Sequence, residues 1–349
     1  MSRTGPPSAL VVTARGRYPR AVRFQPTQPF VPAPGLANEH AQTIYASLVR
    51  PTRTPALRRE RLELPDGDFV DLDGFDGPTG APHVVALHGL EGSSQAGYVT
   101  AILRGAQERG WGATALNFRS CSGEPNRLAR SYHSGDVDDA LRVLNETRAR
   151  VTGPLFAVGF SLGANVLCRL LETLGDDAPV DAAASVSAPY DLDACCRKLD
   201  GGGPFHLLYR ERFLRTLKQK ARHKLRHFPG AFDGKALEAA RTIRAFDDAV
   251  TSVLHGYRDA AHYYAESSSG PRLHAIRRPT LLLSAADDPM LETPVIPPAA
   301  KDNPLLSVVL TDHGGHVGFV GGRLHRPDFW AEAQVLAFFD AVRAQPSPK

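Results

Sequence analysis

Short apolar runs alternate with helix-like stretches along most of the chain. Each run is rich in Val, Leu, Ala and Phe, which is typical of strands buried on both faces of a parallel sheet. The stretches between them carry apolar residues at helical spacing. The pattern predicts strands over 83–89, 112–118, 154–160, 181–187, 279–285 and 305–310, and helices over 97–109, 135–149, 162–174 and 328–343. Such alternation predicts an α/β fold whose mostly parallel sheet carries helices on both faces.

Three regions depart from this alternation. Residues 58–75 alternate polar and apolar side chains around a Pro-Asp-Gly turn, which predicts a β-hairpin. Residues 190–275 have helical patterns and no strand pattern, so we expect a helical cap inserted within one domain that spans 35–349. Open α/β folds place their ligand crevice at the carboxyl ends of the strands, and the cap is expected on that side. Residues 1–34 are Pro-rich and are expected to form a flexible or irregular arm.

One junction between a strand and a helix carries candidate chemistry. The string "LFAVGFSLGANVLCRLL" (155–171) joins a predicted buried strand directly to a predicted helix, with Ser161 between them. Gly159 and Gly163 complete the G-x-S-x-G pattern of a nucleophile elbow. Small residues are needed because strand and helix crowd each other there, and the strained turn lifts the hydroxyl above the sheet. A plain tight turn between strand and helix is the alternative interpretation.

A serine nucleophile requires a base, and the base requires an orienting acid. In proteins with this elbow the chain order is serine, acid, histidine. The string "AADDPM" ends a later predicted strand, and we favour Asp288 over Asp287 because an acid before proline is expected to turn inward over the sheet. In "TDHGGHVGF" we favour His316 over His313, because two glycines let the backbone bend towards the serine. Asp287 and His313 remain open as alternatives, with roles in shaping their loops.

A developing oxyanion requires two backbone N–H donors. The elbow predicts the N–H of Leu162, the residue after the nucleophile, as one donor. The loop "LHGLEGSS" after the strand 83–89 is expected to supply the other from Leu90. His88 in the same string is expected to brace the loop rather than to act as a base.

Several long strings resemble one known family. These are "LHGLEGS", "NFRSCSGEPNRLARSYHSGD", "VGFSLGANVL", "VSAPYDL", "FDDAVTSVLHGYRDAAHYY", "DDPM" and "HGGHVGFVGG". They are similar to the YheT-like α/β hydrolases of bacteria, which are relatives of the ABHD-type esterases and phospholipases of eukaryotes and of the yeast medium-chain ethyl-ester synthase/esterases. The similarity covers roughly 35–343. It implies an α/β-hydrolase fold with a helical cap. It also implies a charge relay, whose positions in the family match Ser161, Asp288 and His316 of this chain.

Other reactive or charged side chains lie near the expected crevice. Arg119, Arg127 and Arg130 follow the strand 112–118, where they could contact an acidic group of a substrate. We favour the alternative that they brace their loop through carboxylates such as Asp136. Cys121 has no base paired with it by any motif and is not expected to be a nucleophile. The string "NEHAQT" (38–43) belongs to the family pattern, but the sequence assigns no role to its histidine.

A basic segment at 207–228 holds eight Lys or Arg residues and one acid. Its apolar residues recur at helical spacing, which places the basic side chains on the other faces. The favoured interpretation is a cap helix with a solvated basic side. The alternative is weak contact with an anionic membrane surface. The apolar stripe consists of Phe213, Leu214, Leu217, Ala221, Leu225 and Phe228.

The overall composition narrows the remaining possibilities. A formal charge of +4 on 349 residues gives no general case for nucleic-acid binding. The four cysteines show neither metal-ligand nor disulfide-framework spacing, and no long apolar segment resembles a signal or a membrane span, so a cytoplasmic protein is expected. No cofactor and no metal are expected, since the usual ligand spacings are lacking.

Together these patterns predict a serine hydrolase that cleaves carboxylic esters through an acyl-enzyme. The apolar cap residues suggest a short- or medium-chain acyl ester as the small-molecule substrate. Transfer of the acyl group to an alcohol, and phospholipid cleavage, are alternatives on the same three residues. A non-catalytic binding protein that keeps the fold is the competing class. The sequence does not indicate an oligomeric state.

Overall fold

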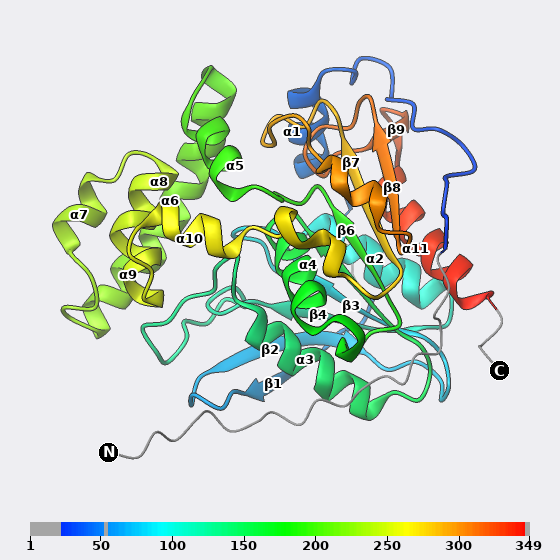
Figure 1. Ribbon diagram of the computed structural model, residues 1–349, viewed down its shortest axis with the longest axis horizontal. Coiled ribbons are helices and arrows are strands. Elements are labelled where there is room, and N and C mark those ends of the chain that lie inside the picture. Colours follow the sequence, from blue (N-terminus) through cyan, green and yellow to red (C-terminus); the bar gives the residue numbers. More distant parts are fainter. Residues whose placement is uncertain (1–21, 52–54, 346–349) are drawn as a thin grey trace.

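An eight-stranded sheet forms the centre of the molecule (Figure 1). The computed structural model describes residues 22–51 and 55–345. The strand order is β1-β2-β4-β3-β5-β6-β7-β8; β2 pairs with both β1 and β4 in antiparallel fashion, and the other neighbouring pairs are parallel. The strands are β1 (Arg58–Glu63), β2 (Phe69–Phe75), β3 (His83–Leu87), β4 (Gly112–Asn117), β5 (Leu155–Phe160), β6 (Ala182–Val186), β7 (Thr280–Ala285) and β8 (Leu306–Thr311).

These bounds confirm the predicted strands to within two residues at either end. The agreement has a physical cause, because strands β3 to β7 are buried along nearly their whole length and therefore consist of short apolar runs. The predicted hairpin is also present, with β1 and β2 joined by the turn at Pro65 and Leu62 paired with Val70. The prediction of a mostly parallel sheet is confirmed.

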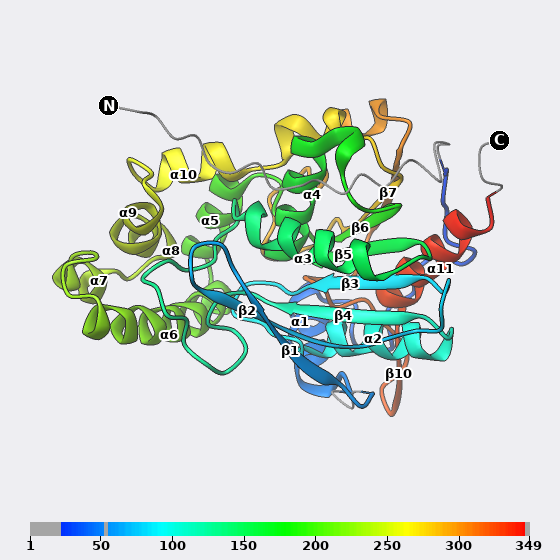
Figure 2. The ribbon, with the colours of Figure 1, turned by 90° about the horizontal axis from the view of Figure 1, so that it is seen from below.

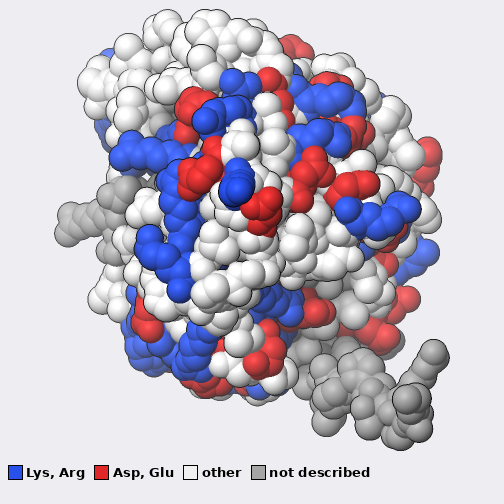
Figure 3. Space-filling view, turned by 90° about the vertical axis from the view of Figure 1, so that its left-hand side faces the viewer, with Lys and Arg blue, Asp and Glu red and all other residues white. Residues whose placement is uncertain are grey.

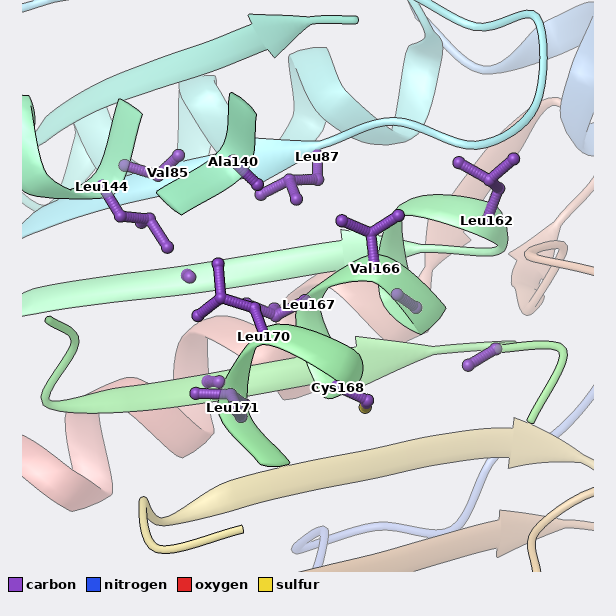
Figure 4. Packing of buried hydrophobic residues seen from close by; sticks show 14 of the residues in the cluster. Val85, Leu87, Ala140, Leu144, Leu162, Val166, Leu167, Cys168, Leu170 and Leu171 are labelled. Carbon is purple, nitrogen blue, oxygen red and sulfur yellow. The ribbon is translucent and has the colours of Figure 1, made fainter. Parts of the chain in front are cut away.

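Helices cover both faces of the sheet (Figure 2). One face is covered by α3 (Val137–Arg150) and α4 (Leu162–Leu174), and the other by α2 (Gly97–Glu108) and α11 (Trp330–Arg343). In the first layer, Leu167, Leu170 and Leu171 of α4 pack over the sheet, and Ala140 and Leu144 of α3 lie beside Val85 of β3 (Figure 4). Their burial stabilises the domain by about 1.5–3 kcal/mol per large apolar side chain.

The chain leaves the sheet after β6 and returns at β7, although these two strands are direct neighbours. The segment between them is helical and forms the lobe on the left of Figure 1. We name α5 to α10 the cap. Its side chains form an apolar cluster of their own, separate from the two layers of the sheet. The helices are α5 (Leu192–Asp200), α6 (Pro204–His227), α7 (Gly234–Ala239), α8 (Ile243–Phe246), α9 (Ser252–His255) and α10 (Ala260–Ser267), and a π-helical turn (Asp247–Thr251) joins α8 to α9.

One helix and a small second sheet were not predicted. Helix α1 (Glu39–Val49) begins at Asn38, whose side chain accepts hydrogen bonds from the backbone N–H groups of His40 and Ala41. Strands β9 (Val320–Arg323) and β10 (Arg326–Phe329) form a second, two-stranded sheet.

The predicted N-terminal arm lies mostly outside the described residues, which begin at Val22. Its described part has no regular structure and runs beside β8, where Ser307 accepts from the N–H of Phe24 at 3.0 Å and donates to the carbonyl of Val22. Phe30 further along contacts the rings of Phe319 and Trp330. None of the helices in the described ranges has the length and apolar character required to cross a bilayer.

Candidate active site

Ser161 occupies a strained turn between β5 and α4. Its backbone has φ 51° and ψ −121°, a conformation that residues with a side chain rarely adopt. The flanking glycines are required by space: a Cβ on Gly159 would lie 2.4 Å from the carbonyl oxygen of Gly163, and one on Gly163 would lie 2.5 Å from that of His88. The elbow therefore presses β5, α4 and the end of β3 against each other, and the serine is the residue at which the chain turns.

The His316 imidazole lies between Ser161 and Asp288. Its Nε2 is 2.9 Å from Oγ of Ser161, and its Nδ1 is 2.8 Å from Oδ2 and 3.1 Å from Oδ1 of Asp288. Asp288 is fully buried, and its Oδ1 also accepts from the backbone N–H of Met290 at 2.8 Å. The structure thus brings together the three side chains that the sequence singled out, in the order hydroxyl, imidazole, carboxylate.

The alternative acid and histidine lie beside this trio and contact each other instead. Nδ1 of His313 is 3.2 Å from Oδ2 of Asp287, and the His313 side chain is half exposed. The other oxygen of Asp287 accepts from the N–H of Gly315 at 2.9 Å. Partial burial raises the pKa of Asp287. This second pair shapes the loop that carries His316, as the alternative interpretation expected.

Helix α1 supports the His316 loop from the other side. The hydroxyl of Thr43 accepts from the backbone N–H of His316 at 2.9 Å. Gly315 has φ 59°, and a Cβ there would lie 2.5 Å from the carbonyl oxygen of Glu39. Sequence reasoning missed this support, although Asn38 followed by a helical pattern is an N-terminal helix signal that could have revealed α1.

The loop after β3 lies against the elbow and is held by hydrogen bonds. Nδ1 of His88 is 2.7 Å from the carbonyl oxygen of Gly89, and Nε2 accepts from the N–H of Phe118 at 3.2 Å. Burial lowers the pKa of His88 to about 4, so its imidazole is neutral near pH 7, with Nδ1 donating and Nε2 accepting. This bracing contact agrees with the role expected for His88.

Tyr132 fixes the next part of the same loop. The N–H of Glu91 donates to the Tyr132 hydroxyl at 2.7 Å, and that hydroxyl donates to Oε1 of Glu91 at 2.8 Å. Glu91 has φ 56°, so these bonds hold a strained residue directly after Leu90. Lys220 of the cap reaches the same Glu91 carboxylate at 2.9 Å. The segment that carries the predicted second oxyanion donor is therefore anchored to both domain and cap.

A mainly apolar cavity opens beside Ser161 and His316 and extends between the sheet and the cap. Leu90, Leu162 and Tyr132 line it from the sheet side. Asp247, in the π-helical turn, is the one carboxylate among its lining residues; its two oxygens accept from the hydroxyls of Thr251 at 2.6 Å and Tyr264 at 2.7 Å. Burial raises the pKa of Asp247 to about 6. The apolar lining from the cap side and from the loop after β7 includes Leu192, Leu199, Phe213, Leu217, Ile243 and Met290.

The arginines after β4 brace their loop. Arg119 is buried and pairs with Asp66, Asp68 and Asp139. Two further pairs join Arg127 to Glu63 and Arg130 to Asp136. These partners match the favoured interpretation and leave no arginine of the three free to face a substrate.

Cys121 is also part of the framework rather than of the chemistry. Its side chain is buried, and burial raises the pKa of the thiol to about 11, which disfavours the reactive thiolate.

Over residues 22–51 and 55–345, no group of three or more His, Cys, Asp or Glu side chains is arranged to hold a metal ion.

Comparison with known proteins agrees with this geometry. Residues 82–322 match the model of the alpha/beta hydrolase fold family. The chain belongs to the α/β-hydrolase family. It is 43% identical to "Putative esterase YheT" of Escherichia coli strain K12 over 90% of this chain and 94% of that protein. Human "Phospholipase ABHD3" is 29% identical over 90% of this chain and 80% of its own. The resemblance to YheT-like hydrolases is confirmed, and the chain is an enzyme of the hydrolase class.

The solved structure of another esterase has the same fold as this chain. The esterase Pf2001 of Pyrococcus furiosus superposes with a TM-score of 0.53 over 81% of this chain and 92% of its own, at 14% sequence identity. At that identity the likeness concerns the fold alone. The prediction of an α/β-hydrolase fold is confirmed.

Proposed function

We propose that this hydrolase is a serine esterase in which Ser161 is the nucleophile, His316 the general base and Asp288 the acid that orients it. One observation carries the proposal: a single imidazole makes both contacts, 2.9 Å to the serine hydroxyl and 2.8 Å to a buried carboxylate. A hydroxyl becomes nucleophilic when a base takes its proton, and the base performs this task when its other nitrogen is held by an acid.

The mechanism follows from these contacts. Nε2 of His316 takes the hydroxyl proton while Oγ of Ser161 attacks the ester carbonyl carbon. The proton then passes to the departing alkoxide, which leaves an acyl-serine. Water attacks the acyl carbon in a second step while the same histidine takes its proton. The bond between that carbon and Oγ of Ser161 then breaks, the histidine returns the proton to Oγ, and the carboxylic acid departs. Asp288 stabilises the imidazolium in both steps.

The N–H groups of Leu90 and Leu162 are proposed as the oxyanion donors. In the described ranges neither N–H donates a hydrogen bond to a protein acceptor, so both are free for a ligand. Leu162 is the first residue of α4, where the helix dipole adds positive potential. Leu90 lies in the loop that Gly89 brings within contact of Ser161, since a Cβ on Gly89 would be 3.1 Å from the Ser161 Cβ.

The substrate is proposed to be a carboxylic ester with a short or medium acyl chain. The cavity beside Ser161 supports this, because its lining is mainly apolar and its walls come from helices of the cap. Among the relatives, one is named a phospholipase and a Saccharomyces cerevisiae relative, 31% identical over 70% of this chain, is named a monoacylglycerol lipase. These names support an ester with an aliphatic acyl chain.

A series of p-nitrophenyl esters of increasing acyl length tests the proposal. We expect hydrolysis with an optimum at short or medium length, and a fall in kcat of about 10⁴ or more for Ser161→Ala or His316→Ala. Addition of an alcohol to the same assay measures acyl transfer, because the alcohol competes with water for the acyl-serine. An alanine variant of Ser161 that keeps wild-type turnover would disprove the assignment.

A further inference from the structure

The cap helix α6 presents two different faces. Tyr209, Phe213 and Leu217 point inward, where Phe213 and Leu217 line the cavity beside Ser161. The sequence predicted that the basic residues of this helix lie on the solvent side, and for Lys218 and Lys224 that prediction is wrong. Both are buried, and their ammonium groups donate to backbone carbonyl groups. The long aliphatic stems allow this arrangement.

The first turn of α6 exposes three large apolar side chains. Phe205, Leu207 and Leu208 are 43%, 48% and 55% exposed and fall within four consecutive positions, after Gly201–Gly203 and Pro204. We name these three residues the apolar tip. Single exposed apolar side chains are ordinary on protein surfaces, whereas a cluster of large ones at the end of a helix is typical of a contact site.

Arginines continue the outer face of α6 beyond the apolar tip. Leu208, Arg212 and Arg215 are spaced by four and three residues and therefore share one side of the helix. Both arginines are exposed, and no carboxylate of the described residues lies within ion-pair distance of either. Figure 3 faces the cap side of the molecule, where Lys and Arg side chains gather towards the left and alternate with acids elsewhere.

The apolar tip is attached to the loop that carries the candidate acid. Nε2 of His206 is 2.9 Å from the carbonyl oxygen of Pro289, the residue after Asp288. The ring of Phe205 stacks on His40 of α1 with 4.3 Å between ring centroids, and the same His40 contacts the Tyr209 hydroxyl at 3.1 Å. The tip therefore sits beside the active-site loop rather than at a remote end of the cap. These contacts also give His40 a structural role that the sequence did not suggest.

We propose that the apolar tip and Arg212 and Arg215 form a docking surface for an anionic phospholipid membrane. The apolar side chains would enter the interface between headgroups and acyl chains, and the two guanidinium groups would contact lipid phosphates. The unpaired positive charge argues for this occupant, because another protein surface would have to supply both an apolar pocket and acids. The proposal rests on the proposed function, since docking would bring lipid-borne esters to the cavity beneath α6.

Vesicle flotation of the full-length chain tests the proposal. We expect binding to vesicles of phosphatidylcholine with phosphatidylglycerol, much weaker binding to phosphatidylcholine alone, and a steep loss of binding with added salt. The double variant Leu207→Ser with Leu208→Ser should bind at least about tenfold more weakly. Arg212→Gln with Arg215→Gln should weaken binding about 25-fold, at about fivefold per charge, and flatten the salt dependence.

Matched variants remove equally exposed side chains elsewhere. Val253→Ser with Leu310→Ser, and Arg258→Gln with Arg277→Gln, should bind like the wild type. Wild-type chain that does not bind anionic vesicles, or apolar-tip variants that bind as tightly as the wild type, would overturn the proposal. So would sedimentation showing a dimer that the tip variants dissociate, since the occupant would then be a second copy.

The soluble p-nitrophenyl esters separate this inference from the proposed function. All four double variants should keep the wild-type kcat/KM on these substrates, because none of the changed residues lines the cavity. Failure of the wild type to hydrolyse any soluble ester would contradict the proposed function. Vesicle binding would still test the docking surface, because that assay does not depend on catalysis.

Discussion

Asp288 lies 2.8 Å from Nδ1 of His316, while its neighbour Asp287 contacts His313 and a backbone N–H instead. Two adjacent carboxylates thus have different tasks. Asp288→Asn should lower kcat by about 10⁴, because an amide disfavours the tautomer that accepts the serine proton. Asp287→Asn should change kcat by less than about tenfold, since an amide oxygen can still accept from Gly315. Steady-state kinetics on one ester compare the two, and equal losses would contradict the assignment.

The elbow should tolerate no side chain at Gly163. A Cβ there would meet the carbonyl oxygens of His88 and Leu87 at 2.5 Å and 2.6 Å. Gly163→Ala should therefore destabilise the fold by about 1–3 kcal/mol and displace the loop that precedes Leu90, with loss of most activity. Gly203→Ala is the matched control, because a Cβ at that position meets no atom within 4 Å. Urea unfolding and ester hydrolysis measure both effects, and a Gly163 variant with wild-type stability would refute the argument.

Tyr132 should act as a positioning residue for the loop after β3, which carries Leu90, the proposed oxyanion donor. Tyr132→Phe keeps the ring that stacks on Phe118 but removes the hydroxyl that accepts from the N–H of Glu91. Complete loss of an oxyanion donor costs about 10²–10³ in kcat, and misplacing one should cost about 10–100-fold with little change in KM. Tyr263→Phe is the control, because its hydroxyl accepts from Ser134, outside that loop. Similar kcat values for the two variants would argue against positioning.

A pair of neighbouring histidines, of which His133 is buried and His255 partly buried, should make the fold sensitive to mild acid. The rings of His133 and His255 lie 4.2 Å apart, and burial lowers the pKa of His255 to about 4. Between about pH 6.5 and 4 the unfolded chain therefore binds a proton that the folded chain does not. As the pH is lowered through this window, the free energy of unfolding should therefore decrease, by up to about 1.4 kcal/mol per pH unit for this group.

His255→Phe removes that group and should reduce the slope of the free energy of unfolding against pH by a similar amount. Near pH 7 the variant should be about as stable as the wild type, since Nε2 of His255 is buried and has no hydrogen-bond partner among residues 22–51 and 55–345. Urea unfolding followed by circular dichroism at pH 7 and pH 5 provides both values. An unchanged slope in the variant would show that His255 is not responsible.

The sheet and the candidate trio could be predicted because local patterns determine them. Buried strands require apolar runs, and the elbow requires Gly159 and Gly163, whose positions a Cβ would obstruct. Asp288 and His316 follow strands whose carboxyl ends meet at one edge. The contribution of α1 could not be predicted, because Thr43 reaches the backbone of His316 across 273 residues of sequence. Nor could the inward position of Lys224, whose charge is satisfied by backbone carbonyl groups of Leu128 and Arg130.

The most direct measurement concerns the reactivity of the Ser161 hydroxyl. A fluorophosphonate probe reacts with serines that a neighbouring base activates, and mass spectrometry locates the adduct. We expect one adduct, on Ser161, no adduct on Ser161→Ala, and greatly slowed labelling of His316→Ala. A wild-type chain that stays unlabelled, or that carries the adduct on another residue, would contradict the account.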